Sequence, residues 1–414
     1  MPAPQEPLKT RCCIAGGGPA GMVLGYLLAR AGVPVIVLEK HADFFRDFRG
    51  DTVHPSTLEI MYELGLLESF LKMPHQVIAH LSGVVNGQSV AVADFSHLPA
   101  HCKFIALMPQ WDFLNFLATE AKKFPAFQLQ METRATGVLQ ENGRVTGLAI
   151  ENKNGPSEIR ADLVIGADGR SSDLRKAAAM EVIDLKSPID VLWMRISRRA
   201  DDPDATGGRF ADGQIFVMIN RGDYWQCAYV VSKDSSDRLR AEGLPKFQKG
   251  ILEVAPFLQD RIHELDDWDK VKLLTVQVNR LRHWAKPGLL FIGDAAHAMS
   301  PVGGVGINLA VQDAVAAANL LFSSLQSGAP SLSQLQTIQK RREWPTRMTQ
   351  AVQVFIQNNI LARSISKPTE KKDLPLALKI MRHLTFLGRI PPRIFGLGFR
   401  PEHVHPSLRA KIPG

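Results

Sequence analysis

A glycine-rich turn between two apolar runs places the strongest constraint on the fold of this chain. A short apolar run at 9–15 precedes the turn Gly16–Gly21, and an apolar stretch at 19–31 and a second apolar run at 33–38 follow it. This order predicts a strand, a turn, a helix and a buried strand within about 30 residues. The glycines allow backbone amides to approach a pyrophosphate, which the positive end of the helix also attracts. The predicted cradle comprises Gly16, Gly18, Pro19, Ala20 and Gly21.

Glu39 directly follows the second predicted strand, 18 residues after Gly21. A carboxylate at this place can accept hydrogen bonds from both hydroxyls of an adenosine ribose. It disfavours a 2′-phosphate, because two negative charges would meet. We therefore expect a dinucleotide with a free adenosine ribose, such as FAD or NAD. A purely structural turn followed by a surface Glu39 is the alternative.

A second glycine-rich segment lies at 293–308, with the sequence GDAAHAMSPVGGVGIN. It leads from a short apolar run at 289–292 into a predicted helix at 306–325. Asp294 can hold a polyol hydroxyl, and the loop amides and helix N-terminus can stabilise a buried anion. The alternative is a loop that needs glycines only for their backbone conformation.

Composition narrows the class of protein. Of 414 residues, 45% are hydrophobic and 22% are charged, which is typical of a globular chain and excludes intrinsic disorder. Four cysteines cannot form a disulfide scaffold for this length, and Cys12 and Cys13 are predicted strand residues. No cysteine–histidine spacing indicates a metal site. The basic excess lies in 361–414, which argues against a general nucleic-acid groove.

The remaining pattern predicts an α/β fold in which β segments are inserted between dinucleotide-type strands. Ser56 and Glu59 form a predicted capping box that opens a helix to about Leu64. Other expected helices cover 111–123 and 333–359. Expected hairpins turn at Asn86-Gly87 and at Asn142-Gly143. Expected strands lie at 159–165, at three places in 190–232, and at 271–281, where the strand continues the second sheet.

Three segments in this order resemble the group A flavoprotein monooxygenases, the aromatic-hydroxylase family related to p-hydroxybenzoate hydroxylase. They are Gly16–Gly21 with Glu39, Gly166–Gly169, and Gly293–Asn308. The resemblance implies a Rossmann-type FAD-binding domain with an inserted mixed β-sheet substrate domain and C-terminal helices. The expected FAD-binding domain comprises 1–75, 100–185 and 283–325, the substrate domain 76–99 and 186–282, and the C-terminal helical region with its basic tail 326–414.

The resemblance also implies residue roles. Glu39 would bind the FAD ribose, Asp294 the ribitol, and Pro301 would lie near the reactive face of the flavin. Asp168 would serve both FAD and NAD(P)H, although a simple turn in which Asp168 pairs with Arg175 is the alternative. Arg49, rather than Arg46, would clamp the pyrophosphate. The full set of implied cofactor-binding residues is Gly16, Gly18, Pro19, Ala20, Gly21, Glu39, Lys40, Arg49, Gln110, Asp168, Gly293, Asp294, Pro301, Gly304, Gly306, Ile307 and Asn308.

The implied activity is the hydroxylation of an aromatic or polyketide-like small molecule. In this family NADPH or NADH reduces a tightly but non-covalently bound FAD, O2 adds at the flavin C4a carbon, and the resulting hydroperoxide transfers one oxygen atom. No catalytic base is identified. His297 fits a hydrogen-bonded structural histidine better than a base, and Arg195 fits a surface ion pair as well as a substrate anchor.

The tail leaves a second interpretation open. Ala377, Ile380, Met381, Leu384 and Leu387 have helical spacing, with basic residues on the other side. A packed C-terminal helix explains this pattern, and so does weak peripheral contact with an anionic membrane. The membrane alternative is a quinone or prenyl-lipid hydroxylase, or a flavoprotein reductase of the same fold. No apolar run is long enough to span a membrane, so we expect a cytoplasmic protein. We also expect it to be a monomer or a homodimer and to bind no nucleic acid.

Overall fold

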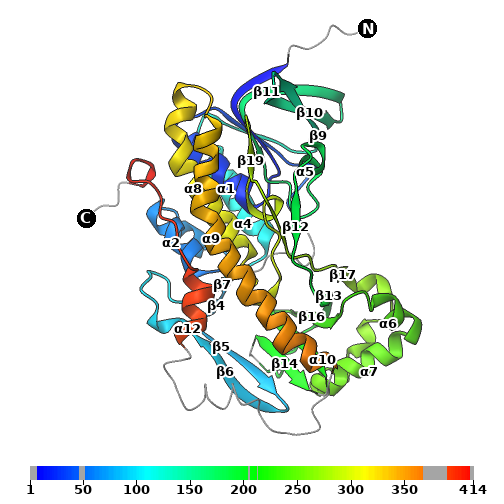
Figure 1. The fold of residues 1–414 in the computed structure, drawn as a ribbon. Coiled ribbons are helices and arrows are strands. Elements are labelled where there is room, and N and C mark those ends of the chain that lie inside the picture. Colours follow the sequence, from blue (N-terminus) through cyan, green and yellow to red (C-terminus); the bar gives the residue numbers. More distant parts are fainter. Residues whose placement is uncertain (1–6, 46–51, 204–205, 212, 367–388, 411–414) are drawn as a thin grey trace.

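The computed structural model describes residues 7–45, 52–203, 206–211, 213–366 and 389–410. Within these residues the chain forms an α/β fold with two large sheets, confirming the predicted fold class (Figure 1). The long helix α9 (Leu332–Ile356) runs between them: its first part contacts the larger sheet and its continuation, α10 (Ala362–Ser366), contacts the other.

The eight-stranded sheet has a parallel centre. Its strand order is β19-β20-β11-β1-β2-β8, and β9 and β10 extend it from β11. The strands are β1 (Leu8–Ala15), β2 (Val35–Leu38), β8 (Phe127–Gln130), β9 (Arg134–Glu141), β10 (Arg144–Asn152), β11 (Gly155–Gly166), β19 (Ala285–Lys286) and β20 (Leu289–Phe291). Because β1, β2, β11 and β20 are parallel, their carboxyl ends meet at one edge. Ligands bind at such an edge in open α/β sheets.

Helix α1 (Pro19–Arg30) connects β1 to β2, as predicted. It is buried on nearly every side and packs against α8 (Gly306–Ser327). Close helix–strand approach needs Gly25, because a Cβ there would press against Val37. The formation of the unit of β1, α1 and β2 therefore depends on the local sequence pattern, and its close packing depends on the small size of Gly25.

The seven-stranded sheet has the order β17-β13-β16-β15-β14-β5-β6. Its strands are β5 (His80–Val85), β6 (Gln88–Asp94), β13 (Ile189–Ser197), β14 (Gly207–Ala211), β15 (Gln214–Asn220), β16 (Tyr224–Ser232) and β17 (Lys272–Leu274). One face packs on α7 (Leu244–Val254) next to α6 (Ser236–Glu242), through Phe247 and Ile251. The opposite face belongs to a second buried cluster, in which Ile215 and Val230 lie with Leu361, and Val302 of the second glycine-rich segment packs against this cluster. That segment thus lies between the two sheets.

Smaller elements complete the described fold. Strands β3 (Thr52–Val53), β4 (Gln76–Ile78) and β7 (Ile105–Leu107) form a three-stranded sheet, and β12 (Val182–Asp184) pairs with β18 (Asn279–Leu281). Helices α2 (Pro55–Glu63), α3 (Leu67–Leu71), α4 (Gln110–Ala121) and α5 (Asp173–Ala177) surround the larger sheet. The C-terminal segment begins with α12 (Ile390–Pro392) and a π turn at Arg393–Leu397.

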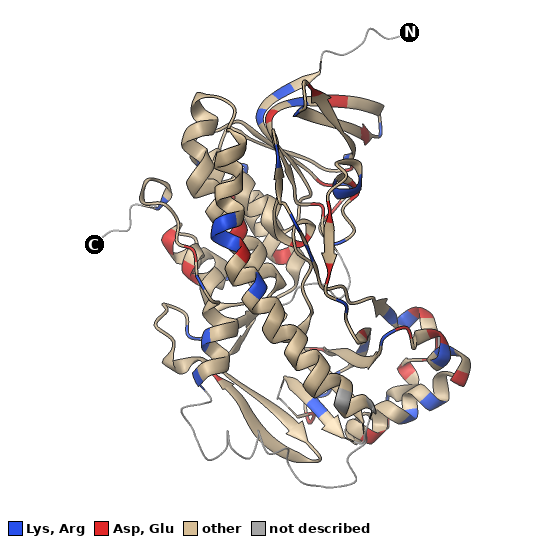
Figure 2. Ribbon diagram, viewed as in Figure 1, with Lys and Arg blue, Asp and Glu red and all other residues tan. Residues whose placement is uncertain are grey.

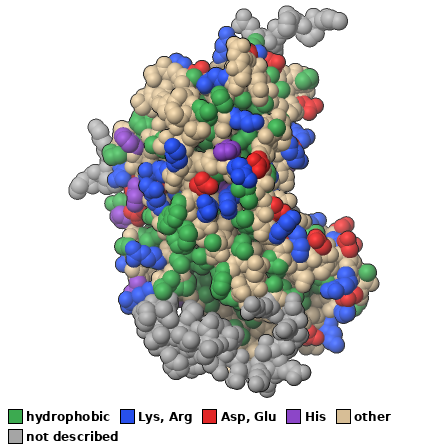
Figure 3. Space-filling model, in the orientation of Figure 1, with side chains coloured by type: hydrophobic (Ala, Val, Ile, Leu, Met, Phe, Trp, Pro, Cys, Tyr) green, Lys and Arg blue, Asp and Glu red, His purple; other side chains and the backbone are tan. Residues whose placement is uncertain are grey.

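Helix α8 is long and apolar enough, by length and composition, to cross a membrane. However, 78% of its most apolar window is buried inside the molecule, as in the core helix of a soluble protein. The exposed apolar side chains lie elsewhere and include Trp344 and Phe355 of α9. Figure 3 shows hydrophobic side chains on the face of the molecule along which α9 runs. The amphipathic stretch 377–387, on which the membrane alternative depends, lies outside the described residues.

Some local predictions were wrong. The capping box is absent: His54 is the N-cap of α2, Ser56 lies inside the helix, and Glu59 bonds to His101 instead. Pro55 at the first helical position favours a helix start here, because the N–H that proline lacks would have no partner at that position anyway. The span 190–232 holds four strands rather than three. The strand predicted at 271–281 is divided: β17 joins the seven-stranded sheet, whereas β18 pairs with β12. Both predicted hairpin turns are confirmed, with positive φ at Asn86 and Asn142.

Candidate active site

The turn after β1 has the close approaches that its glycines permit. Gly16 has φ +112° and donates its N–H to the Leu38 carbonyl at 2.9 Å, which joins the ends of β1 and β2. A Cβ at Gly21 would collide with the Gly16 carbonyl, whereas a Cβ at Gly18 would meet nothing. Gly18 is the N-cap of α1 and offers no side-chain cap. The first amides of α1 therefore face an open cradle, which suits an anion.

Glu39 stands beside this cradle. Its carboxylate accepts hydrogen bonds from the Gly17 N–H at 3.2 Å and from the His41 N–H at 3.1 Å. These contacts orient the group next to the first helix turn, where a ribose attached to a pyrophosphate would lie. The neighbouring Lys40 is exposed and contributes to the field at Asp173.

Asp168 follows β11 at the same sheet edge. Its Oδ2 accepts the Leu174 N–H at 3.2 Å, while its buried Oδ1 has no partner within the described parts of the chain. Burial raises the pKa of Asp168 above its ordinary value, against hydrogen bonds from Ser172 and the backbone. The alternative pairing with Arg175 is not formed as an ion pair: the Arg175 guanidinium donates to Asn279 Oδ1 and to the Arg170 carbonyl.

Asp294 and Arg170 lie opposite each other, with 3.6 Å between Arg170 Nη2 and Asp294 Oδ2. Both side chains are partly exposed, and Arg170 Nη1 is buried with no partner in the portion of the chain described. A ligand with hydroxyl and phosphate oxygens would satisfy these groups and the free oxygen of Asp168. The edge of the large sheet thus carries three carboxylates, those of Glu39, Asp168 and Asp294, together with the Arg170 guanidinium and the N-terminus of α1.

The loop between Gly293 and Asn308 forms the other wall. Gly293, Gly303 and Gly304 have φ of +58°, +77° and +63°, so side chains are strained there. Thr52 Oγ1 donates to the Gly304 carbonyl at 2.7 Å. Helix α8 then begins after Val305 without a side-chain cap, and a Cβ at Gly306 would meet nothing. The N-terminus of α8 is therefore uncapped and open, like that of α1.

Asn308 is held by the start of α2. Its Oδ1 accepts the His54 N–H at 3.1 Å and the Thr57 hydroxyl at 2.6 Å, while Ile307 beside it is buried. Burial lowers the pKa of His54 to about 4, despite smaller opposing contributions from the backbone of Phe395 and Gly304. His54 is therefore neutral near pH 7. Sequence reasoning gave it no role.

A buried ionic network supports the Gly293 turn, and sequence reasoning missed it. Asp313 of α8 accepts the Gly293 N–H at 3.0 Å, binds His297 Nε2 at 2.5 Å and accepts Arg342 Nε at 3.0 Å. Burial would raise the pKa of Asp313, but His297 and Arg342 outweigh it and hold the pKa below its ordinary value. His297 is thus hydrogen-bonded inside the protein. The one signal in the sequence is Asp313 itself, a charged residue within the otherwise uncharged stretch 306–327.

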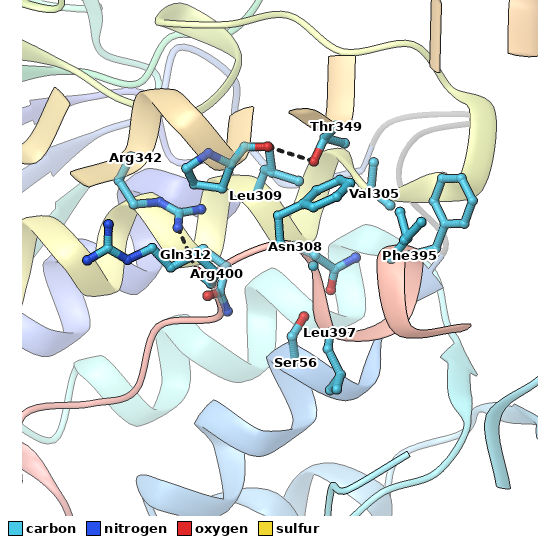
Figure 4. Close-up of a pocket in the computed structure, with 14 residues that line it drawn as sticks. Ser56, Val305, Asn308, Leu309, Gln312, Arg342, Thr349, Phe395, Leu397 and Arg400 are labelled. Carbon is cyan, nitrogen blue, oxygen red and sulfur yellow. Dashed lines mark hydrogen bonds between the residues drawn. The ribbon is translucent and has the colours of Figure 1, made fainter. Parts of the chain in front are cut away.

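The network continues into the C-terminal segment. Arg342 lies 3.5 Å from Glu402 and donates to the Arg400 carbonyl, and the Arg341 guanidinium donates to both carboxylate oxygens of Glu402. A cavity of about 20 Å³ lies beside these groups, behind the start of α8 and under residues 394–400 (Figure 4). Asn308 Nδ2 and Gln312 Nε2 are buried near it without partners among the described residues. This volume has room for one or two water molecules only, which is too small for an aromatic substrate.

The three other positions considered from the sequence are Gln110, Arg195 and Arg49. Gln110 is the first residue of α4, after β7, which pairs with the β3 strand that carries Thr52. Arg195 is exposed, lies 3.6 Å from Asp223 and stacks over Tyr224, which fits the surface ion pair. Arg49 lies outside the described residues.

The residues present fit FAD. Two uncapped helix N-termini, at Gly18 and Gly306, can face the pyrophosphate and the pyrimidine edge of the flavin. Glu39 can hold the adenosine ribose and Asp294 the ribitol chain. The oxygen of Asp168 that has no partner among the described residues is available to a further hydroxyl. No Cys, His, Asp or Glu cluster in the described ranges has the arrangement of a metal site.

Comparison with known proteins agrees with this geometry. The model of the FAD binding domain family matches residues 9–352. The chain is 29% identical over 391 residues to 6-methylpretetramide 4-monooxygenase of Streptomyces rimosus, covering 94% of this chain and 93% of that protein. It is 24% identical over 325 residues to para-nitrophenol 4-monooxygenase of Pseudomonas sp. strain WBC-3, covering 76% and 78%.

A solved structure supports the same fold. The OxyS anhydrotetracycline hydroxylase from Streptomyces rimosus superimposes with a TM-score of 0.75 at 20% identity, covering 95% of this chain and 77% of that one. The family match, the relatives and the fold together identify the chain: it belongs to the FAD binding domain family and is an FAD-dependent monooxygenase of the group A aromatic-hydroxylase type.

Proposed function

We propose that this enzyme uses NAD(P)H and O2 to hydroxylate an aromatic or polyketide-like small molecule. The observation that carries the proposal is that Gly293, the neighbour of Asp294, lies against Ala20 of α1 and Ala310 of α8, at the sheet edge where Glu39 follows β2. Bound FAD would supply the redox chemistry of oxygen insertion. The names of the relatives, which act on a pretetramide and a nitrophenol, support this substrate class.

The chain's own residues would bind and orient the cofactor. The first amides of α1 would hold the pyrophosphate, Glu39 the adenosine ribose, and Asp294 the ribitol. The start of α8, at Gly306 and Ile307, would stabilise negative charge on the pyrimidine ring, because the positive end of a helix dipole lies there. Asn308, held by α2, would keep this helix start in place.

The substrate would lie between the Pro301 loop and the inner face of the seven-stranded sheet. That face is apolar: Ile215 and Val230 belong to a buried cluster against which Phe210 and Val302 pack. An apolar wall excludes water from the reacting atoms, which favours transfer of oxygen to the substrate over release of H2O2. The C4a-hydroperoxide route and the domain boundaries given above stay predictions, as do cytoplasmic localisation and the monomeric or dimeric state.

The experiment is a spectrum followed by a turnover screen. The purified enzyme is expected to be yellow, and NADPH or NADH in air is tested with phenols, aromatic acids, quinones and aromatic polyketides. Oxygen uptake that one ligand class stimulates, with little H2O2, would support the proposal. Reduction by NAD(P)H that yields only H2O2 with every phenol, acid and polyketide would contradict it. Selective turnover of quinones would favour the quinone hydroxylase or reductase.

A further inference from the structure

Helix α9 buries several polar side chains and exposes two large apolar ones. Trp344 and Phe355 are 53% and 61% exposed, whereas Gln350, Gln353 and Gln357, the last just beyond the end of α9, are fully buried. No charged residue occurs between 348 and 362, and Figure 2 shows this half of the helix without charges. Glutamine is mostly exposed in proteins, so three buried copies need specific partners.

The three glutamines share one helical face, because their spacing is i, i+3 and i+7. That face meets the loop at 298–302. Gln353 makes three hydrogen bonds there: its Nε2 donates to the Ser300 carbonyl at 3.0 Å and to the Val302 carbonyl at 2.8 Å, and its Oε1 accepts the Ser300 N–H at 3.2 Å. A single side chain thus binds the backbone on both sides of Pro301.

The two neighbouring glutamines extend the same contact. Gln350 Nε2 donates to the Ala298 carbonyl at 3.2 Å and to the Asn279 carbonyl at 2.9 Å. Gln357 Nε2 donates to Ser300 Oγ at 2.7 Å. The residues before, at and after Ser300 are therefore held from one side by amides of one helical face.

The loop needs such partners because of its own sequence. Pro301 has no N–H, and Gly303 and Gly304 have left-handed φ, so the loop cannot join a regular backbone ladder. An apolar side chain of equal size would fill the space beside it without orienting its peptides. Two donors and one acceptor from Gln353 fix the rotation of the peptides that flank Pro301.

We infer that Gln353, supported by Gln350 and Gln357, is a positioning residue that sets the Pro301 segment at the substrate side of the cofactor. The inference rests on the proposed function, in which Pro301 lies near the reactive face of the flavin. Gln353 acts through the loop and touches neither substrate nor cofactor in this account.

The expected consequence concerns coupling. In the coupled reaction NAD(P)H, a proton, O2 and the substrate give NAD(P)+, water and the hydroxylated product. In the uncoupled reaction NAD(P)H, a proton and O2 give NAD(P)+ and H2O2, and the substrate is unchanged. A displaced Pro301 loop misaligns substrate and cofactor, so oxygen transfer slows while H2O2 release continues.

The test replaces Gln353 with Met, which keeps length and removes all three hydrogen bonds. Gln336→Met, at an exposed position of α9, is the matched control. With the panel compound that best stimulates oxygen uptake, we expect the ratio of H2O2 to product to rise about tenfold in Gln353→Met and to stay unchanged in the control. The KM for that compound should rise while FAD affinity stays within about threefold of wild type. Wild-type coupling and KM in Gln353→Met would overturn the inference.

A readout without turnover separates this inference from the proposed function. Visible circular dichroism of bound FAD reports the surroundings of the flavin, and we expect Gln353→Met to change it while Gln336→Met does not. If no panel compound is turned over by the wild type, the proposed function fails, and this spectrum alone decides the role of Gln353. If Gln353→Met does not fold or bind FAD, Gln357→Met decides, since it loses the bond to Ser300 Oγ: a changed flavin signal supports the inference and a wild-type signal overturns it.

Discussion

The carbonyl oxygen of Gly16 occupies the space that a Cβ at Gly21 would need. This contact joins the beginning of the first glycine turn to the first turn of α1, and it brings the helix N-terminus close to the end of β1. The same turn leaves Gly18 open, since nothing lies within 4 Å of its Cβ position. The two glycines therefore serve different purposes: Gly21 permits packing, and Gly18 keeps a surface clear.

The first prediction separates these two purposes. Gly21→Ala is expected to lower both the unfolding midpoint and the FAD content, because the turn must shift. Gly18→Ala should keep the unfolding midpoint of the wild-type apoprotein and lose FAD, because its methyl group would enter the cradle without meeting protein atoms. Thermal unfolding and the flavin-to-protein absorbance ratio measure both effects. Gly328→Ala, which also has open space at its Cβ, is the control. Full FAD content in Gly18→Ala would place the pyrophosphate elsewhere.

The second prediction concerns Glu39. Glu39→Ala should weaken FAD binding by about 1–3 kcal/mol, because two hydrogen bonds to ribose hydroxyls are lost. Titration of the apoprotein with FAD gives the dissociation constant. Glu141→Ala, at an exposed ion pair with Arg160 on the sheet edge, should leave this constant unchanged. An unaltered affinity in Glu39→Ala would remove the ribose role.

The third prediction concerns the pair formed by Asp294 and Arg170. Asp294→Ala should yield protein with little FAD, since the carboxylate expected to bind the ribitol is absent, while Arg170 stays nearby. Arg170→Met should reduce FAD content less, because it removes a guanidinium whose ion pair is partly exposed. Absorbance spectra of the purified variants measure the bound flavin. Equal and complete FAD content in both variants would contradict the assignment of this loop.

The fourth prediction is a pH dependence of stability that arises from His54. Its pKa is about 4 in the folded protein and about 6.5 when unfolded, so the unfolded state binds the proton first. The His54 contribution is fully present above pH 6.5 and falls by roughly 3 kcal/mol as the pH drops toward 4. Urea unfolding at a series of pH values measures it. His54→Met should flatten this part of the profile, whereas exposed His283→Gln should not; parallel profiles for all three proteins would refute the role of His54.

The fifth prediction compares a buried and an exposed carboxylate. Asp313→Asn should lower the free energy of unfolding by about 3–5 kcal/mol, because Arg342 would lose a buried charged partner. Asp162→Asn, which breaks the surface pair with Arg11, should cost less than about 1 kcal/mol. Urea unfolding of both variants gives the two values. A similar small loss in each would mean that Asp313 is not the centre of the network.

Local spacing allowed much of this molecule to be predicted from its sequence. The strand, glycine turn and helix around Gly16–Gly21 follow from positions a few residues apart, and Asn86-Gly87 and Asn142-Gly143 specify their turns in the same way. The family, the cofactor and the fold class could also be inferred, because the glycine segments must have nearly this order to let a backbone approach a dinucleotide.

The amino-acid sequence by itself thus determined the unit of β1, α1 and β2, the glycine turns and the class of chemistry. The tertiary structure decided which polar side chains are buried and what they hold. Asp313 supports Gly293 from 20 residues away, Gln353 binds Ser300 from 53, and β5 joins β14 across more than a hundred. A glutamine or aspartate on a helix has no local signal for burial, because its partners come from distant segments and exist only once the helices and sheets have packed.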